Sequence, residues 1–177
     1  LVLLHGYGSH EGDLFQLSPR LPLKPVIASV RAPIPESGGW AWFSLAERAV
    51  GAPTTADADA AARAVLGWLD TLSYTTVSLL GFSQGACLTT EFTARNPRRY
   101  GGIVALTGGL IGPDGTPRDY PGSLDGTPVF LGSSDPDFHI PVERVHETER
   151  VLTGMGAVVT KRIYPGMGHT VNEDEIA

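Results

Sequence analysis

The sequence of 177 residues has few of the features that mark membrane, secreted or nucleic-acid-binding proteins. Its single cysteine, Cys87, excludes an internal disulfide, fits a reducing compartment and is expected to be a small core residue. No apolar run reaches the ~18 residues of a membrane-spanning helix, and no signal peptide is visible. The net charge of −6 disfavours nucleic acid or an anionic membrane as the main partner. We therefore expect a cytoplasmic protein without a nucleic-acid partner and without membrane insertion.

Two kinds of binding site are also incomplete in the sequence. A dinucleotide fingerprint needs three glycines at fixed spacing after the first strand, and Gly6-Tyr7-Gly8 lacks the third. Glu143 and His146 resemble half of a metal site, but no second half lies nearby in the sequence. A solvated helix face explains this pair better. We expect neither a cofactor nor a metal ion.

The composition and length fit one globular domain. Hydrophobic residues make up 42% of the sequence and charged residues 18%, which is typical of a protein with a substantial core. We find no internal repeat, low-complexity tract or linker. The sequence starts inside the apolar run Leu1–Leu4 and stops at Glu173–Ala177, which looks like the first turn of a helix. We expect residues 1–177 to form a single domain from which residues at both ends are missing.

Six short apolar runs alternate with helices or with connections of helical length. We expect these runs to be strands, at Leu1–Leu4, Val26–Val30, Thr75–Leu80, Ile103–Leu106, Val129–Leu131 and Val158–Ile163. Helices are expected at residues 57–72, from Gln84 to Asn96, and at residues 142–153. This alternation predicts an α/β fold with a mostly parallel sheet and helices on both faces. Ligands of such folds bind at the carboxyl ends of the strands.

The central apolar run leads into a G-x-S-x-G turn, Gly81-Phe82-Ser83-Gln84-Gly85. In a strand-to-helix turn of this kind the serine hydroxyl is exposed on a strained backbone, and a Cβ at either glycine would clash with the neighbouring strand and helix. The N–H of Gln84 at the helix start would point at a developing oxyanion. The pentapeptide alone is weak evidence, because a glycine-rich loop with a surface serine could also contain it.

Other strand ends bring further reactive groups to the same edge of the sheet. Asp135 and Asp137 follow the fifth strand, and His169 follows the sixth, which gives the chain order Ser…Asp…His of α/β-hydrolases. A serine hydroxyl needs a base to take its proton, and a carboxylate can hold that base in the correct tautomer. His169 is the candidate base for Ser83. The spacing alone leaves both aspartates open as the acid.

Four blocks of sequence carry a resemblance to the phospholipase/carboxylesterase family of α/β-hydrolases, close to the acyl-protein thioesterases. They resemble, in order, the family's L-H-G-x-G loop, its G-F-S-Q-G elbow, its D-x-x-[VI]-P acid block and its Y-x-G-x-x-H block. A W-F pair of the family is also present. The matching residues are Leu3–Ser9, Gly81–Ala86, Asp137–Pro141, Tyr164–His169 and Trp42-Phe43.

The resemblance implies a role for each matching residue. It favours Asp137 over Asp135 as the acid, and Asp135 would then cap or orient its loop. The acid block lacks the histidine–glycine pair that is common before the acid in the thioesterases, which bears on the substrate class rather than on the triad. The roles carried over are nucleophile for Ser83, base for His169, acid for Asp137 and backbone oxyanion donors for Tyr7 and Gln84.

The predicted substrate is a carboxylic ester of short to medium acyl chain. The loop of residues 31–42 carries two tryptophans, which either cover the core or form an apolar wall of the pocket. The residues expected to contact substrate are Trp40, Trp42, Phe43, His139 and Met167. A thioesterase or lysophospholipase, a lactone hydrolase or peptidase, and a non-catalytic binding scaffold stay open as alternatives. A homodimer is an open alternative for the assembly.

Overall fold

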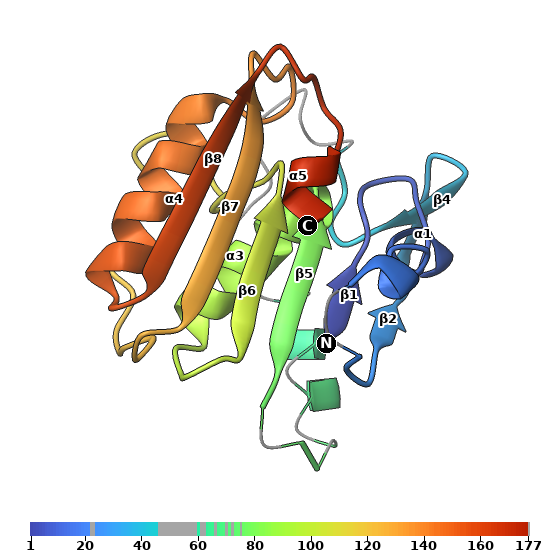
Figure 1. Cartoon of the computed structure of the whole chain (residues 1–177), viewed down its shortest axis with the longest axis horizontal. Coiled ribbons are helices and arrows are strands. Elements are labelled where there is room, and N and C mark those ends of the chain that lie inside the picture. The colour runs from blue at the N-terminus through green and yellow to red at the C-terminus, as the bar shows by residue number, and fades with distance from the viewer. Residues whose placement is uncertain are drawn as a thin grey trace.

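Six parallel strands form the central sheet of the computed structural model, which describes residues 1–21, 24–45, 60, 63–65, 67–69, 71, 73–74 and 76–176. Their spatial order is β2-β1-β5-β6-β7-β8 (Figure 1). The bounds are β1 Val2–Leu4, β2 Ala28–Val30, β5 Ser78–Phe82, β6 Gly102–Leu106, β7 Pro128–Asp135 and β8 Val158–Pro165. The predicted α/β fold with a parallel sheet is therefore confirmed.

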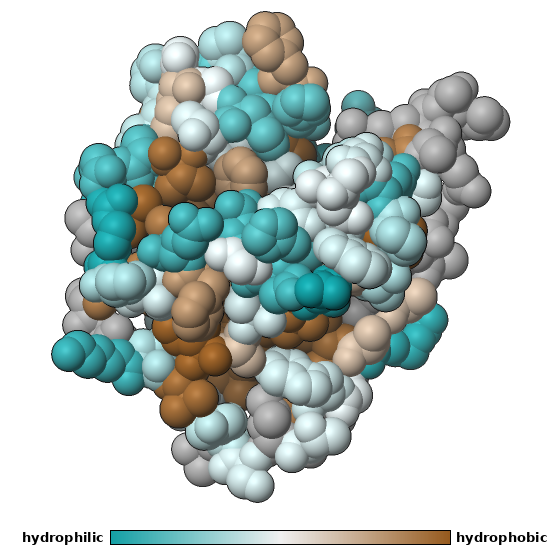
Figure 2. Space-filling view, turned by 90° about the vertical axis from the view of Figure 1, so that its right-hand side faces the viewer, coloured by the Kyte–Doolittle hydropathy of each residue, from teal (hydrophilic) through white to brown (hydrophobic). Residues whose placement is uncertain are grey.

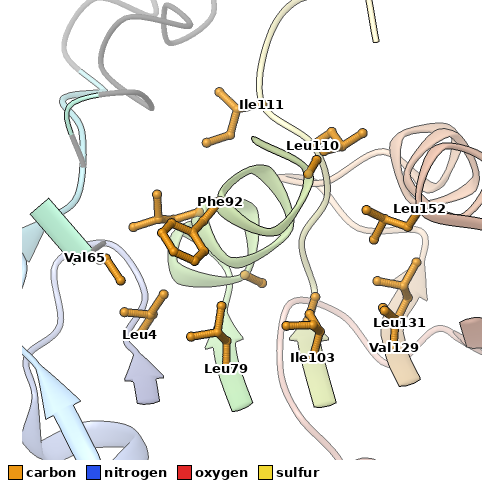
Figure 3. Close-up of a cluster of buried hydrophobic side chains, with 14 of the residues drawn as sticks. Leu4, Val65, Leu79, Phe92, Ile103, Leu110, Ile111, Val129, Leu131 and Leu152 are labelled. Atoms are coloured by element: carbon orange, nitrogen blue, oxygen red, sulfur yellow. The ribbon is translucent and has the colours of Figure 1, made fainter. Parts of the chain in front are cut away.

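Successive side chains of a strand point to opposite faces of the sheet, and this alternation divides the core in two. On one face, residues such as Leu4, Leu79 and Ile103 form a row against Phe92 (Figure 3). On the other face, Leu3 belongs to a smaller apolar cluster. Because both faces are covered, the strands contain continuous apolar runs rather than an apolar–polar alternation.

Two long helices cover the larger apolar face (Figure 1). They are α3, Gln84–Arg95, and α4, Val142–Gly154, and both match the helices expected from the sequence. The short helices α1, Gly12–Phe15, and α5, Glu173–Ile176, lie on the opposite side, with a 3-10 turn at Ser18–Arg20 after α1.

The helix expected at residues 57–72 lies largely outside the described residues. Where the structure describes it, residues 63–65 and 67–69 are helical. Val65 and Leu69 are buried in the larger core cluster, as the predicted apolar face requires. Ala61 and Leu72 of that face lie outside the described residues.

The loop of residues 31–42 contains a small hairpin that the sequence pattern did not predict. Strand β3, Ile34–Glu36, pairs in antiparallel fashion with β4, Gly39–Ala41. Ser37 and Gly38 connect them with φ angles of 53° and 78°, as a two-residue hairpin turn requires. Three-residue strands that include a proline give no readable alternation, which is why the pattern predicted only a loop.

Strands β7 and β8 run further than expected because they pair with each other along their whole length. Their register joins Pro128 to Val158 at one end and Asp135 to Pro165 at the other. Asp135 is therefore the last residue of a strand, and Asp137 lies in the loop beyond it.

Strand β2 forms the edge of the described sheet and is three residues long. Figure 2 shows the side of the molecule on which β2 lies, where hydrophilic residues cover much of the surface and hydrophobic residues show in separate areas. Next to β2, Arg31 pairs with Glu11. A short strand with charged neighbours offers little ladder for pairing with another chain. Of the helices described, none has the length and apolar character to cross a membrane.

Candidate active site

Ser83 lies on a strained turn between β5 and α3. It caps the helix with φ 54° and ψ −118°, a backbone conformation that few residues other than glycine adopt. A Cβ on Gly81 would lie 2.3 Å from the carbonyl oxygen of Gly85, and one on Gly85 would lie 1.9 Å from the carbonyl oxygen of Leu4. Both glycines of the G-x-S-x-G turn are therefore required by the close approach of β5, α3 and β1.

His169 lies between Ser83 and Asp137. The Nδ1 atom of His169 is 2.8 Å from Oδ2 of Asp137, and its Nε2 atom is 2.8 Å from Oγ of Ser83. A carboxylate can only accept, so Nδ1–H donates to Asp137 and Nε2 is left to accept the proton of Ser83. The ring of His169 also contacts the rings of Phe82 and His139, with centroids 5.4 Å and 4.7 Å away.

Asp137 is held as an anion by its surroundings. Its side chain is fully buried, and its Oδ1 atom accepts the backbone N–H groups of His139 and Ile140 at 2.7 Å and 3.0 Å. Burial opposes the negative charge. The hydrogen bonds from His169 and from the two backbone N–H groups outweigh burial and lower the pKa of Asp137 below its usual value.

The structure brings Asp137, and not Asp135, to the histidine. Asp135 is exposed at the end of β7, and its carbonyl oxygen accepts the N–H of Gly166 at 3.0 Å. Two residues further on, the chain has turned so that the carboxylate of Asp137 faces inward to His169. Strand β7 thus extends as far as Asp135, and only Asp137, in the loop beyond the strand, reaches the histidine.

Tyr7 and Gln84 border the same cavity as Ser83. Gln84 is the first residue of α3, so its N–H is one of the helix-terminal groups without an intrahelical acceptor. Its side chain accepts the N–H of Trp42 at 2.8 Å and donates to the carbonyl of Phe43 at 2.6 Å. The amide side chain thus fixes the segment after β4 against the turn that carries Ser83.

A cavity of about 720 Å³ opens beside Ser83 and His169. Its lining combines apolar side chains with a few polar ones, among them Arg144 and Asp114. An apolar hollow with few convergent polar groups suits a small organic substrate. Its apolar side chains include Phe43, Leu45, Cys87, Leu110, Ile111 and Ile140.

Of the five residues expected to contact substrate, Phe43 and His139 line the cavity. Met167 does not line it, and its sulfur instead accepts the side-chain amide of Asn172 at 2.9 Å. Cys87 borders the cavity and is only half buried, although the sequence analysis assigned it to the core. It lies one helical turn after the serine, and its N–H donates to the carbonyl of Ser83 at 2.9 Å.

The two tryptophans do not line the cavity, so the expectation that they form its wall is wrong. Trp42 is 4% exposed, and its indole N–H donates to the carbonyl of His5 at 2.8 Å. The half-buried Trp40 has its ring under the guanidinium of Arg31 at 5.0 Å. The alternative reading, in which this loop covers the core, describes Trp42 correctly.

His5 has a structural role, although it follows a strand end. It is 1% exposed, its Nδ1 atom lies 2.8 Å from the carbonyl of Gly6, and its Nε2 atom accepts the N–H of Ala32 at 3.1 Å. Burial lowers the pKa of His5, which fits a neutral ring that accepts a backbone N–H. Within the described part of the chain, no group of three or more His, Cys, Asp or Glu side chains could hold a metal ion.

A buried carboxylate that the sequence analysis missed supports one side of the cavity. The side chain of Glu91 in α3 is fully buried, and it accepts the N–H of Ile111 at 3.0 Å and the hydroxyl of Tyr120 at 3.0 Å. It also pairs with Arg95 at 2.5 Å. Glu91 and Arg95 are four residues apart, a spacing that is usual for exposed ion pairs on a helix. The spacing of Glu91 and Arg95 could be seen in the sequence, but the burial of Glu91 could not.

Comparisons with known proteins agree with this architecture. The sequence model described as phospholipase/carboxylesterase matches residues 1–177. A probable carboxylesterase of Oryza sativa subsp. japonica is 28% identical over 196 residues, covering 99% of this chain and 83% of the relative. Acyl-protein thioesterase 1 of Gibberella zeae is 31% identical over 103 residues. That alignment covers 56% of this chain and 43% of the thioesterase, so less than half of the relative's length is matched.

Solved structures match over almost the whole chain. A phospholipase/carboxylesterase from Dyadobacter fermentans has a TM-score of 0.80 and 36% identity, with 99% of this chain and 84% of that chain covered. A carboxylesterase from Bacillus cereus has a TM-score of 0.85 at 23% identity, with 99% and 82% covered, and this likeness concerns the fold. At the level of the family, the prediction of a carboxylic ester hydrolase is confirmed. The chain belongs to the phospholipase/carboxylesterase family of α/β-hydrolases.

Proposed function

We propose that this protein is a serine hydrolase that cleaves carboxylic esters of short to medium acyl chain. Ser83 is the nucleophile, His169 the general base and Asp137 the acid that orients it. The observation that carries the proposal is the continuous row of hydrogen bonds, with 2.8 Å from Ser83 to His169 and 2.8 Å from His169 to Asp137. Nucleophile, base and orienting carboxylate within hydrogen-bond reach are the requirements of this chemistry.

The reaction has two acyl-transfer steps. Ser83 Oγ attacks the ester carbonyl while His169 Nε2 takes its proton, and a tetrahedral intermediate forms. The intermediate collapses when His169 returns that proton to the leaving alcohol, which leaves an acyl group on Ser83. Water then attacks the acyl carbonyl while His169 Nε2 takes its proton. The bond to Ser83 Oγ breaks as His169 returns that proton to Oγ, which releases the acid and restores the free serine.

The backbone N–H groups of Tyr7 and Gln84 stabilise the oxyanion in both steps. The support for Gln84 is its place at the start of α3, where an N–H without an intrahelical acceptor and the positive end of the helix dipole coincide. The support for Tyr7 is that it borders the same cavity, in the loop directly after β1. Removing one such donor typically costs about 3 kcal/mol of transition-state stabilisation.

The charge of Asp137 completes the arrangement. Its lowered pKa keeps the carboxylate ionised at neutral pH. An anion hydrogen-bonded to Nδ1 stabilises the imidazolium that forms when His169 takes the serine proton. The proton itself stays on the histidine.

The acyl chain would occupy the apolar part of the cavity. Phe43, Leu110 and Ile111 offer hydrocarbon surface in the cavity that Ser83 borders, and Arg144 and Asp114 add charged groups to its lining. A thioester substrate is the second candidate, favoured by the 31% identity to an acyl-protein thioesterase. The cytoplasmic location, the absence of a nucleic-acid partner and the open alternative of a homodimer stay predictions.

Hydrolysis of p-nitrophenyl esters from acetate to decanoate tests the proposal. We expect turnover that is highest for short or medium chains, and labelling of Ser83 by a fluorophosphonate. Ser83→Ala should lower kcat by about 10⁴-fold or more, with an unchanged circular dichroism spectrum. Near-parental hydrolysis by the variant would exclude Ser83 as the nucleophile. Comparing acyl-thioesters with oxygen esters of equal chain length ranks the two substrate candidates.

A further inference from the structure

In the loop that carries His169, the only backbone–backbone hydrogen bond between the residues flanking the histidine, among the described residues, runs from the N–H of Thr170 to the carbonyl of Gly168 at 3.0 Å. The loop follows β8, and Gly168 adopts a left-handed φ of 78° directly before the histidine. The hydrogen bonds of the His169 side chain go to Ser83 and Asp137. Both of these partners belong to the proposed triad. Hydrogen bonds from other residues to the backbone beside His169 are therefore needed to keep its ring aligned during turnover.

Ser134 holds the residue before the histidine. This serine lies in β7, is 0% exposed, and its Oγ atom accepts the N–H of Gly168 at 2.9 Å. The same Oγ is 3.2 Å from the carbonyl of Tyr164 and 3.3 Å from that of Pro136, and its single proton can be donated to either. One hydroxyl thus joins the loop of the acid to the loop of the base.

Thr107 holds the residue after the histidine. It lies directly after β6, is 0% exposed, and its hydroxyl donates to the carbonyl of Thr170 at 3.2 Å. Its own N–H donates to the carbonyl of Gly132 at 2.7 Å, which fixes it to β7. The hydroxyls of Ser134 and Thr107 therefore form hydrogen bonds to the backbone on the two sides of His169, and each hydroxyl lies at the end of a core strand.

We propose that Ser134 and Thr107 are positioning residues, and we name the pair the hydroxyl clamp. The clamp fixes the backbone on both sides of His169 and so sets the ring between Ser83 and Asp137. This inference rests on the function proposed above. A misplacement of about 1 Å in a catalytic group can cost on the order of 10²-fold in rate.

The adjacent serine supplies a matched control. Ser133 is also a buried residue of β7, but its hydroxyl has no hydrogen-bond partner among the described residues. Ser134→Ala should lower kcat for a p-nitrophenyl ester by about 10- to 100-fold and leave KM within about twofold. Ser133→Ala should stay within about twofold of the parent in both constants. Equal kcat values for the two variants would overturn the proposal.

Thr107 allows a second, independent test if Ser134→Ala does not fold. Thr107→Val keeps the shape and removes the hydroxyl, so kcat should fall by about 10-fold. Thr107→Ser keeps the hydroxyl and should restore most of the rate. A role in packing alone would give the reverse ranking, because valine fills the space of threonine better than serine does. That ranking would overturn the proposal for Thr107.

A readout without turnover separates the clamp from the proposed function. The proton on Nδ1 of His169, which is hydrogen-bonded to Asp137, should give a low-field proton resonance in the parent and in Ser133→Ala. This resonance should broaden or shift in Ser134→Ala, and an unchanged resonance there would refute the clamp. If the parent neither hydrolyses esters nor reacts with a fluorophosphonate, the proposed function fails, whereas the resonance still reports whether Ser134 positions the histidine.

Discussion

The two sides of the cavity are built by different means. On one side, which we call the rim, the groups at Ser83, Asp137 and His169 lie in loops that hold one another through single hydrogen bonds. On the other side, which we call the wall, residues 109–114 line the cavity, and the N–H of Ile111 donates to the buried carboxylate of Glu91. In the proposed reaction, the rim touches the reacting atoms and the wall faces the rest of the substrate.

This difference assigns different consequences to changes in the two regions. A change in the rim alters interactions made in the transition state, so it should act on kcat with little effect on the free energy of unfolding. A change beneath the wall removes buried pairing, so it should act first on stability and then on which acyl chains fit. Variants of one residue on each side can test this separation.

The largest effect should come from the acid of the rim. Asp137→Asn keeps the shape but offers the wrong hydrogen-bonding group to Nδ1 of His169, and it should lower kcat by about 10⁴-fold. Asp135→Asn changes an exposed residue at the end of β7 and should stay within about threefold of the parent. Steady-state kinetics of the two variants measures the difference. A larger loss in Asp135→Asn would mean that the acid has been assigned to the wrong residue.

The next effect should come from the support of the wall. Glu91→Gln removes the charge that Arg95 and Arg118 face and puts an amide donor against them, which should lower the free energy of unfolding by about 3 kcal/mol. Urea unfolding measures this loss. The exposed Glu143→Gln in α4 is the matched control and should change stability by less than about 0.5 kcal/mol.

In the folded Glu91→Gln variant, the wall should also fit its substrate less well. Ile111 loses part of its anchoring, so KM for the preferred acyl chain should rise several-fold while kcat for the shortest ester changes little. A variant that is as stable as the parent would show that the carboxylate is no support. A fall in kcat alone would mean that the wall and the rim are not separable.

The three residues of the rim could be predicted from the sequence because the topology of the sheet brings them together. The ends of parallel strands share one edge of the sheet, so Ser83, Asp137 and His169 had to lie near one another once the strands were recognised. The two glycines of the turn were also readable, since each has backbone of a neighbouring element within 2.5 Å of where a Cβ would be. Sequence patterns succeed where backbone geometry alone decides the outcome.

The support of the wall and the positions of the tryptophans could not be predicted, because they depend on the direction in which each side chain points. The sequence analysis assigned Glu91 no role and left Trp42 open between a place over the core and a place in the pocket wall. The structure buries Glu91 under an otherwise irregular loop, and it turns Trp42 to hydrogen-bond with His5. Both outcomes depend on partners 20 or more residues away, at separations of 20 and 37 residues. Local periodicity carries no information about such partners.

A smaller effect should come from Arg144 in α4, next to Asp114 of the wall. Arg144 lines the cavity and pairs with Asp114 and Glu147, each at 2.9 Å. Arg144→Gln leaves these two carboxylates without that cation, so esters with a negatively charged acyl group should bind more weakly. We expect KM for a succinate monoester to rise about 3- to 10-fold and KM for the neutral butyrate ester to stay within about twofold. Equal changes for both esters would show that the charge of Arg144 does not face the substrate.

The smallest effect concerns the pH dependence of stability at the rim. The pKa of Asp137 in the folded protein lies below its ordinary value of 3.8, so the folded state binds the proton of this carboxyl less readily than the unfolded state does. Its charge therefore stabilises the fold above about pH 4, and this contribution is lost as the pH falls through the lower folded pKa. Asp137→Asn has no such group, so the difference in unfolding free energy between parent and variant should be constant from about pH 5 to 7 and should shrink towards pH 2. Urea unfolding across this range measures the difference, with Asp135→Asn as the control. A difference that grows in acid would mean that burial, which opposes the charge, outweighs the hydrogen bonds that hold Asp137 in place.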